Sequence, residues 1–206
     1  MQTEILWIAP LTALLGGYLL GSIPFGVLLT RAGGAGDLRA VGSGNIGATN
    51  VLRTGRRGLA AATLLLDMLK GALAVWLALR WSPGDAPLAA AGAFVGHCHP
   101  VWLRFRGGKG VATLMGVATA LHPPIGLVYA IVWIGMLALL RYSSLAGMAA
   151  AVAAPVAAAM FDRFDLVLLL LAFAVIVLYK HRGNIGRLLD GAEPRVGRLS
   201  RGAAHG

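Results

Sequence analysis

Residues 124–140 read PIGLVYAIVWIGMLALL and contain no charged side chain. A helix that crosses a hydrocarbon core of about 30 Å needs roughly 20 consecutive, mainly apolar residues. In lipid every backbone polar group must be satisfied within the protein, and a segment this apolar does so as a helix rather than as a barrel strand. The stretch therefore predicts a membrane-spanning helix, and with it an all-α membrane protein.

Further apolar segments lie on both sides of this one. Two of them are marginal, because one contains His97 and Pro100 and the other makes only about 18 Å of helix at 1.5 Å per residue. Short helices are tolerated where they pack against protein or line a polar cavity. The first segment is too long for a signal peptide and lacks a cleavage site, so we expect it to be retained. We expect about seven transmembrane helices, two of them short, over residues 5–29, 59–79, 88–103, 110–121, 124–140, 145–160 and 165–179.

The composition agrees with a membrane protein. Of the 206 residues 58% are hydrophobic and 13% are charged, whereas a soluble domain is about 45–50% apolar and about 25% charged. The 29 glycines predict closely packed helices. A single cysteine, Cys98, cannot form an internal disulfide, and no His/Cys cluster has zinc-site spacing. Neither a disulfide nor a structural zinc site is therefore indicated, and no other cofactor is expected.

The basic residues predict an orientation in the membrane. Lys and Arg in short loops mark the cytoplasmic side. With the N-terminus external, 15 of the 18 Lys and Arg fall in inner loops or the C-terminal tail, and only Arg80 and Arg163 fall outside. The net charge of +10 thus comes mainly from basic loops on the cytoplasmic side of the membrane. We therefore expect no nucleic-acid partner. The C-terminus, with a cationic tail over residues 194–206, is predicted to be cytoplasmic.

The first inner loop, residues 36–58, reads GDLRAVGSGNIGATNVLRTGRRG. Its flexible backbone and small donors can wrap an anion, while Arg39 and Arg53 can bind phosphate or carboxylate oxygens. An ordinary Gly/Asn turn with arginines at the lipid headgroups is the alternative. The candidate anion-binding residues of this loop are Gly42, Ser43, Gly44, Asn45, Thr49, Asn50 and Arg53.

The second inner loop reads RFRGGKGVAT, residues 104–113. Lys109 stands among Gly107, Gly108 and Gly110, and Thr113 lies just inside the next helix, whose N-terminal amides point back toward the lysine. The pattern resembles a phosphate cradle, although it lacks the spacing of a nucleotide-binding P-loop. A basic loop held by lipid headgroups is the alternative.

The third inner segment reads KHRGNIGRLLDGAEP, residues 180–194. His181, Asn184 and Arg187 are spaced by three, so a continuing helix would present them on one face. The alternative is a solvated positive helix end, with Asp190 and Glu193 paired to the arginines.

Polar residues also occur within the apolar segments. Asp67 and Lys70 lie three apart in the second one, and because an unpaired charge in lipid is costly, we expect them to pair. His97 and His99 are two residues apart and would point away from each other on a helix, so a two-histidine metal site is not expected. Cys98 is expected to pack in the core.

Three quoted stretches, GSGNIGATNVLRTG, GHCHPVWLRFRGGKGVAT and HRGNIGRLLDGAE, resemble in order and spacing the bacterial integral-membrane glycerol-3-phosphate acyltransferases that use acyl phosphate as donor. The segments LLLDMLKGA and RYSSL also match. The resemblance runs from Gly21 to Glu193. His99 stands where the family usually has an aromatic residue, which concerns local packing more than chemistry.

The resemblance implies transfer of a long acyl chain from acyl phosphate to the 1-hydroxyl of glycerol-3-phosphate, giving lysophosphatidic acid and phosphate. It implies one transmembrane catalytic domain, residues 1–193, in the bacterial inner membrane, with its active site facing the cytoplasm. We expect a monomer whose partners are its two substrates and membrane lipid. By resemblance the catalytic residues are Ser43, Arg53, Lys109, His181 and Asn184, with Gly107, Gly108 and Gly110 at the glycerol-3-phosphate site and Ser144 touching substrate.

Three questions stay open from the sequence. The proton of the attacking hydroxyl could go to His181 or to the departing phosphate, whose second pKa is about 6. Ser43 could instead carry the acyl group, although no His or Asp adjoins it. A membrane transporter of a small phosphate-bearing anion is the alternative function, since short interrupted spans also suit alternating access. Against it, the basic loops share one face and no inverted repeat is visible.

Overall fold

A computed structural model describes residues 7–197, and all regular structure in this range is helical, with no strand. The all-α prediction is therefore confirmed for the described chain. Three short 3₁₀ turns join some of the helices. The α-helices are α1 (Ile8–Gly21), α2 (Phe25–Ala32), α3 (Ala48–Leu52), α4 (Arg57–Trp81), α5 (Ala86–Cys98), α6 (Val111–Leu121), α7 (Pro123–Leu140), α8 (Ser143–Met160), α9 (Phe164–Lys180) and α10 (Arg182–Leu189).

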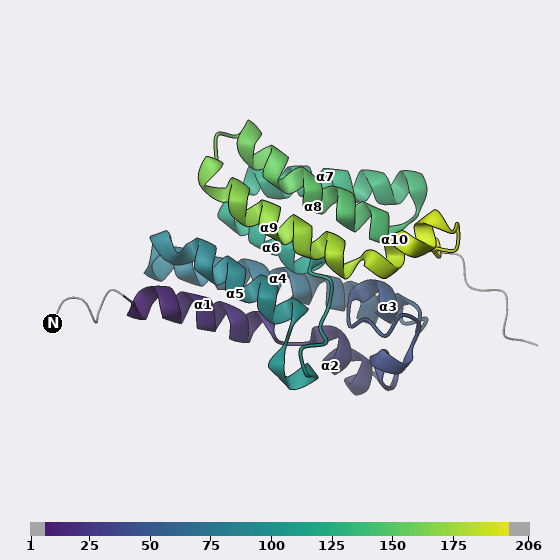
Figure 1. Cartoon of the computed structure of the whole chain (residues 1–206). Helices are drawn as coiled ribbons and strands as arrows, with labels where there is room; N and C mark the ends of the chain where they lie inside the picture. The colour runs from purple at the N-terminus through teal and green to yellow at the C-terminus, as the bar shows by residue number, and fades with distance from the viewer. Residues whose placement is uncertain (1–6, 198–206) are drawn as a thin grey trace, which may run out of the picture.

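The long helices lie side by side in a bundle (Figure 1). The described chain enters the bundle at one end and leaves it at the other. Helix α1 packs on α5, α4 on α6, and α8 between α7 and α9. Each of the seven predicted segments contains a helix. Within residues 7–197, four spans are long and apolar enough to cross a membrane, namely Ile8–Ala32, α4, α7 and α8, or five if α9 and α10 count as one. The number seven and the orientation of the termini stay predictions.

At three places a helix ends or bends where the sequence suggests that it continues, and two of these places lie near a proline. Residues 5–29 do not form one helix, because α1 ends at Gly21 and α2 begins after Pro24, and a residue before proline disfavours the helical conformation. Helix α5 ends at Cys98, before Pro100, so the predicted segment 88–103 is shorter than expected. The third motif does not continue straight from α9, because α10 is bent from it by 58° at His181.

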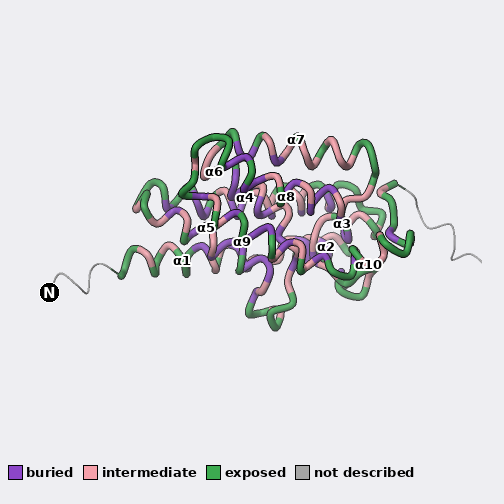
Figure 2. The backbone as a smooth tube through the Cα atoms, turned by 45° about the horizontal axis from the view of Figure 1, so that its top comes forward, coloured by how far each residue is buried: buried purple, intermediate pink, exposed green. Residues whose placement is uncertain are grey.

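Small residues allow the helices to approach closely, as the glycine content predicts. A Cβ atom added at Gly17 would lie 2.3 Å from the carbonyl oxygen of Ala89 in α5, and one at Gly21 would lie 2.0 Å from that of Ala93. The backbones of α1 and α5 therefore touch, which is typical of membrane helices. Figure 2 shows buried residues inside the bundle and exposed ones along its outer surface. Many exposed side chains are large and apolar, including Leu168 at 77% and Leu139 at 80%, which suits contact with lipid.

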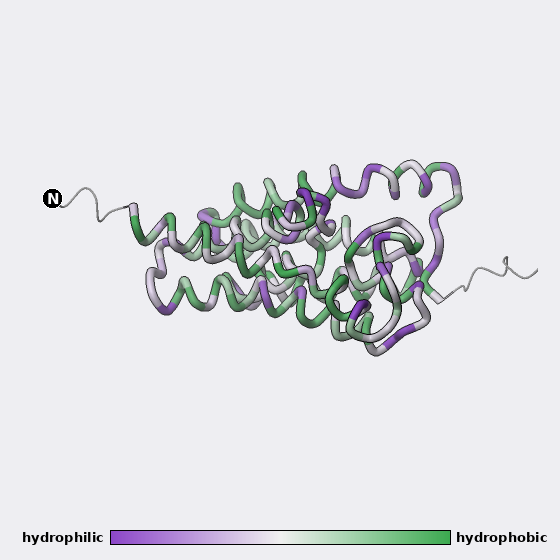
Figure 3. The backbone as a smooth tube through the Cα atoms, turned by 90° about the horizontal axis from the view of Figure 1, so that it is seen from below, coloured by the Kyte–Doolittle hydropathy of each residue, from purple (hydrophilic) through white to green (hydrophobic). Residues whose placement is uncertain are grey.

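The polar residues gather mainly toward the end from which the C-terminus leaves (Figure 3). The start of the predicted cationic tail is packed there: the backbone N–H of Val196 donates to the Arg141 carbonyl at 2.7 Å, and Arg195 Nε donates to the Tyr142 hydroxyl at 3.1 Å. Residues 194–197 therefore belong to the folded body. The remainder of the predicted tail, residues 198–206, lies outside the described residues.

Candidate functional site

A cavity of about 110 Å³ lies where the three basic segments meet. All five residues predicted to be catalytic line it, together with five of the ten predicted to bind substrate. Gly42, Gly44, Gly107, Gly108 and Thr113 do not line it. The predicted residues that line the cavity are Ser43, Asn45, Thr49, Asn50, Arg53, Lys109, Gly110, Ser144, His181 and Asn184.

The first motif forms a tight loop that is held together by Asn50. The Asn50 amide group donates to the carbonyls of Leu38 at 3.0 Å and Val41 at 2.9 Å, and its oxygen accepts the backbone N–H of Ser43 at 3.2 Å. The buried Asn50 side chain thus shapes the loop, which is a role the sequence did not predict. Gly42 and Gly44 have φ values of 53° and 68°, a region that favours glycine. Both glycines therefore shape the loop rather than line the cavity.

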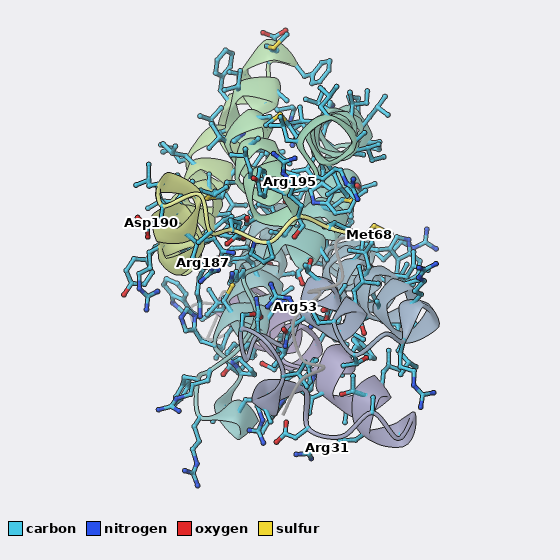
Figure 4. The ribbon with its side chains drawn as sticks, turned by 90° about the vertical axis from the view of Figure 1, so that its right-hand side faces the viewer. Arg31, Arg53, Met68, Arg187, Asp190 and Arg195 are labelled. Atoms are coloured by element: carbon cyan, nitrogen blue, oxygen red, sulfur yellow. The ribbon has the colours of Figure 1, made fainter. Side chains whose placement is uncertain are left out.

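Arg53 follows α3 and lines the cavity, whereas Arg39 does not. Figure 4 shows Arg53 near the middle of the molecule when it is viewed along the bundle. No carboxylate within residues 7–197 forms an ion pair with Arg53. Arg39 instead pairs with the exposed Asp37 at 2.9 Å. The expectation that both arginines flank an anion is therefore wrong for Arg39, and Arg53 alone supplies positive charge from this loop.

The second motif is anchored to the end of α5. The backbone N–H of Gly107 donates to the carbonyl of Cys98 at 3.2 Å, and that of Gly108 donates to His97 at 3.0 Å. Because these two amides are already bonded, they do not cradle an anion, contrary to the prediction. Gly110 does line the cavity, and its φ of 86° requires glycine. Thr113 is fully buried behind the cavity wall.

The first turn of α6 supplies the amides that the glycines do not. Val111 and Ala112 begin this helix and line the cavity. The first N–H groups of a helix have no partner within it, and together with the helix dipole they favour an anion. The predicted contribution of this helix N-terminus is therefore compatible with the observed geometry.

Lys109 projects into the cavity and reaches the third motif, where its Nζ donates to Asn184 Oδ1. Burial lowers the pKa of Lys109 to about 8; the Glu193 carboxylate opposes this shift, and the positive charges of Arg187 and Arg53 add to it. Two cationic side chains, Lys109 and Arg53, thus share one small cavity. Such an arrangement attracts an anion strongly.

His181 stands between α9 and α10, and its ring is buried. Its Nδ1 lies 2.8 Å from the Val177 carbonyl oxygen. Because a carbonyl can only accept, Nδ1 carries the proton, and Nε2 of the neutral ring is an acceptor. Burial and the Lys109 ammonium lower the pKa of His181 to about 4.

Glu193 connects Ser144 to the third motif. Its carboxylate accepts hydrogen bonds from Ser144 Oγ at 2.6 Å, Asn184 Nδ2 at 2.5 Å and Arg187 Nε at 2.7 Å. Although burial raises the pKa of Glu193, these hydrogen bonds hold it below its ordinary value. Pairing of Glu193 with an arginine is therefore confirmed. The same expectation is wrong for Asp190, which forms no ion pair in residues 7–197 and lies at the outer edge in Figure 4.

The cavity also contains residues that sequence reasoning left out, among them Asp67, His97 and Trp133. Asp67 Oδ1 lies 2.7 Å from Lys70 Nζ, so the predicted pairing within the membrane segment is confirmed. His97 lies beside them, with Nδ1 3.6 Å from Asp67 Oδ1. Cys98 is buried in the core, as expected. A polar residue in an apolar segment is the only signal that could have identified Asp67.

The sequence matches known proteins over most of its length. The profile of the glycerol-3-phosphate acyltransferase family matches residues 11–191. A glycerol-3-phosphate acyltransferase of Erythrobacter litoralis is 60% identical over 188 residues, 91% of this chain and 95% of that protein. One from Mesorhizobium japonicum is 56% identical over 185 residues, 90% of this chain and 95% of that protein.

The fold also matches a solved structure. The crystal structure of PlsY (YgiH), an integral membrane glycerol 3-phosphate acyltransferase, in its glycerol 3-phosphate form has a TM-score of 0.87 at 36% identity, covering 91% of this chain and 96% of that one. Its lysophosphatidic acid form has a TM-score of 0.82 at 34% identity, covering 91% and 95%. With the family profile covering the three motifs that meet at the cavity, the chain belongs to the glycerol-3-phosphate acyltransferase family of integral membrane enzymes.

Proposed function

We propose that this enzyme transfers a long acyl chain from acyl phosphate to the 1-hydroxyl of glycerol-3-phosphate, giving lysophosphatidic acid and inorganic phosphate, the first step of phospholipid synthesis. The observation that carries the proposal is a cavity that combines Arg53, Lys109 and the first turn of α6. Both proposed substrates bring a phosphate group. Positive charges and helix amides at one place offset the repulsion between the two phosphates.

The proposed reaction needs no covalent intermediate on the enzyme. Acyl phosphate is an activated donor, so the substrate hydroxyl can attack its carbonyl carbon directly, and phosphate leaves with the electrons of the broken C–O bond. The nearest polar side-chain atom to Ser43 Oγ is Asn50 Oδ1, at 3.5 Å, and no base is paired with it. This surrounding favours a contact to phosphate for Ser43 over a role as nucleophile.

We propose that the departing phosphate takes the proton of the hydroxyl. A His181 side chain with a pKa of about 4 is a weak proton acceptor near neutral pH, whereas phosphate with a second pKa of about 6 is a stronger one. The free Nε2 of His181 can accept a hydrogen bond from the hydroxyl and thereby orient it. Asn184, which is bonded to both Lys109 and Glu193, keeps that lysine in place.

An apolar groove of about 620 Å³ runs along α8, and we propose that it holds the acyl chain. Its residues Leu145 and Ile185 directly follow Ser144 and Asn184 of the cavity, so one end of the groove lies close to the polar site along α8 and α10. At 1.5 Å per residue the distance from Leu145 to Met160 is about 22 Å. An extended palmitoyl chain, with carbon–carbon bonds of about 1.5 Å, is roughly 20 Å long.

The groove predicts a dependence on chain length. Ala153 lines the groove about 12 Å from Leu145 along the helix. We expect Ala153→Trp to lower kcat/KM for palmitoyl phosphate about tenfold through overpacking, and that for octanoyl phosphate, whose chain ends earlier, by less than about twofold. Leu168→Trp, on an exposed face of α9 outside the groove, is the matched control. Equal losses with both donors would show that the acyl chain lies elsewhere.

The proposed location is the bacterial inner membrane, with the cavity facing the cytoplasm. The distribution of Lys and Arg supports this orientation. In a Cys98→Ser background, we expect a cysteine at position 85 to react with a membrane-impermeant thiol reagent added outside intact cells. A cysteine at position 200 should react only after the cells are opened. The reverse pattern would overturn the orientation.

The reaction itself is tested with purified protein in detergent. We expect lysophosphatidic acid to form from glycerol-3-phosphate and palmitoyl phosphate, and not from palmitoyl-CoA. Product from palmitoyl-CoA alone would refute the proposed donor. Proteoliposomes that take up glycerol-3-phosphate without any donor would instead support a transporter.

A further inference from the structure

The glycine loop of the second motif lies against a buried histidine that stands outside the basic segment 104–113. His97 is 3% exposed, near the end of α5, and lines the same cavity as Lys109. A Cβ atom built on Gly108 would lie 2.0 Å from His97 Nε2 and 2.7 Å from its Cε1. The loop therefore lies directly against the imidazole ring, and only glycine fits at this position while the ring is there.

The ring itself is confined on its other side. His97 Nδ1 lies 3.6 Å from Asp67 Oδ1, and that oxygen lies 2.7 Å from Lys70 Nζ. Lys70 in turn donates to the carbonyl of Ile23, in the break between α1 and α2, at 2.7 Å. Asp67 of α4 therefore backs the ring on the side away from the loop, and Lys70 ties Asp67 to the break between α1 and α2.

The backbone of the same residue holds the loop as well. The His97 carbonyl accepts the Gly108 N–H at 3.0 Å. The next carbonyl, that of Cys98, accepts both the Gly107 N–H at 3.2 Å and Lys180 Nζ at 2.8 Å. Main-chain hydrogen bonds therefore fix the loop laterally, and the imidazole ring fixes how closely it approaches α5.

We infer that His97 is a positioning residue for glycerol-3-phosphate: its ring is the platform that sets the place of the Gly107–Gly110 loop and hence of Lys109. The inference rests on the proposed role of Lys109 in binding phosphate. The inference explains why positions 107 and 108 are both glycine. Gly108 is required by the side chain of His97, whereas Gly107 is required by backbone, since its added Cβ would lie 2.2 Å from the His97 carbonyl oxygen.

This difference provides a test with a matched control. Gly108→Ala and Gly107→Ala should each raise the Kd for glycerol-3-phosphate, measured by titration without donor, about tenfold. His97→Ala removes the ring but not the carbonyl. In the His97→Ala background, we expect Gly108→Ala to add less than about twofold, whereas Gly107→Ala should keep its full tenfold effect.

The possible results distinguish failure of this inference from failure of the proposed phosphate-binding role of the second motif. If Gly108→Ala keeps its full effect without the ring, or if the ring also relieves Gly107→Ala, the platform is refuted. If both glycine variants fold and bind glycerol-3-phosphate normally, the phosphate role of the second motif fails, and the inference fails with it.

If the glycine variants do not fold, the His97→Ala variant alone tests the inference. His97→Ala alone should raise the KM for glycerol-3-phosphate about threefold and leave kcat within twofold, with an unchanged Tm. A lower Tm with an unchanged KM would indicate a purely structural role and would overturn the inference.

Discussion

Replacing Lys109 with alanine should lower kcat/KM for glycerol-3-phosphate by at least about 100-fold, and Arg53→Ala should do the same. A charge-assisted hydrogen bond contributes up to about 3 kcal/mol, a phosphate charge left unpaired in the cavity adds to this cost, and each 1.36 kcal/mol corresponds to a factor of ten. Both side chains line a small cavity in which two phosphate groups are proposed to meet. Steady-state kinetics on folded, detergent-purified variants measures the effect.

Arg39→Ala is the matched control for loss of one positive charge. Arg39 comes from the same loop as Arg53, but it pairs with the exposed Asp37 and does not line the cavity. We expect its kcat/KM to stay within about twofold of the wild type, since exposed ion pairs contribute at most about 1 kcal/mol. Near-normal activity of a folded Lys109 or Arg53 variant would remove that residue from the site.

The pKa of Lys109 adds a second readout. With a pKa of about 8, the ammonium is charged below that pH and becomes neutral above it, whereas glycerol-3-phosphate stays a dianion above its second pKa of about 6. The KM for glycerol-3-phosphate should therefore rise above pH 8. Arginine keeps its charge over this range, so a Lys109→Arg enzyme that retains activity should lose this rise.

The sequence predicts the helical fold because a backbone that crosses the bilayer must satisfy its hydrogen bonds within the protein. Residues 124–140 have no alternative in lipid to a helix, and α7 occupies them almost completely. The breaks near Pro24 and Pro100 were not predicted, since the expected segments 5–29 and 88–103 run through both prolines. The 58° bend at His181 has no proline or glycine at its centre. It follows from the packing of α10 near Ser144 through Glu193, a contact 49 residues apart in the chain.

The sequence predicts which three loops contribute to the site, but it does not predict the role of each residue in them. Runs of Gly, Asn and Arg identify flexible basic loops, and hydropathy places them on one face. The sequence does not show which partner a given amide takes: Gly107 and Gly108 bond to the end of α5, and Asn50 bonds to its own loop. Asp67 and His97 lie in stretches that resemble the family, but only the packing of α4, α5 and α6 places them at the cavity.

His181→Gln should lower kcat/KM about 50-fold, less than removal of a cation, and should leave the pH dependence of the remaining rate unchanged. In the proposed mechanism His181 orients the attacking hydroxyl through Nε2, while the leaving phosphate takes the proton. Glutamine keeps a polar group near this position but not its geometry. Because burial and Lys109 lower the pKa of His181 to about 4, the histidine is neutral throughout the assay range in the wild type, and glutamine does not titrate in the variant.

The competing mechanism makes a different prediction for the same measurement. If His181 were the general base, bound substrate phosphate would have to raise its pKa, and the wild-type profile would show an acid-limb ionisation that disappears in His181→Gln. Profiles of kcat against pH, which report ionisations of the enzyme–substrate complex, distinguish the two cases when they are measured beside kcat/KM for both enzymes and the second ionisations of glycerol-3-phosphate and acyl phosphate are fitted separately. An ionisation present only in the wild type would refute proton transfer to phosphate, whereas parallel profiles separated by a constant factor would leave His181 as the group that orients the hydroxyl.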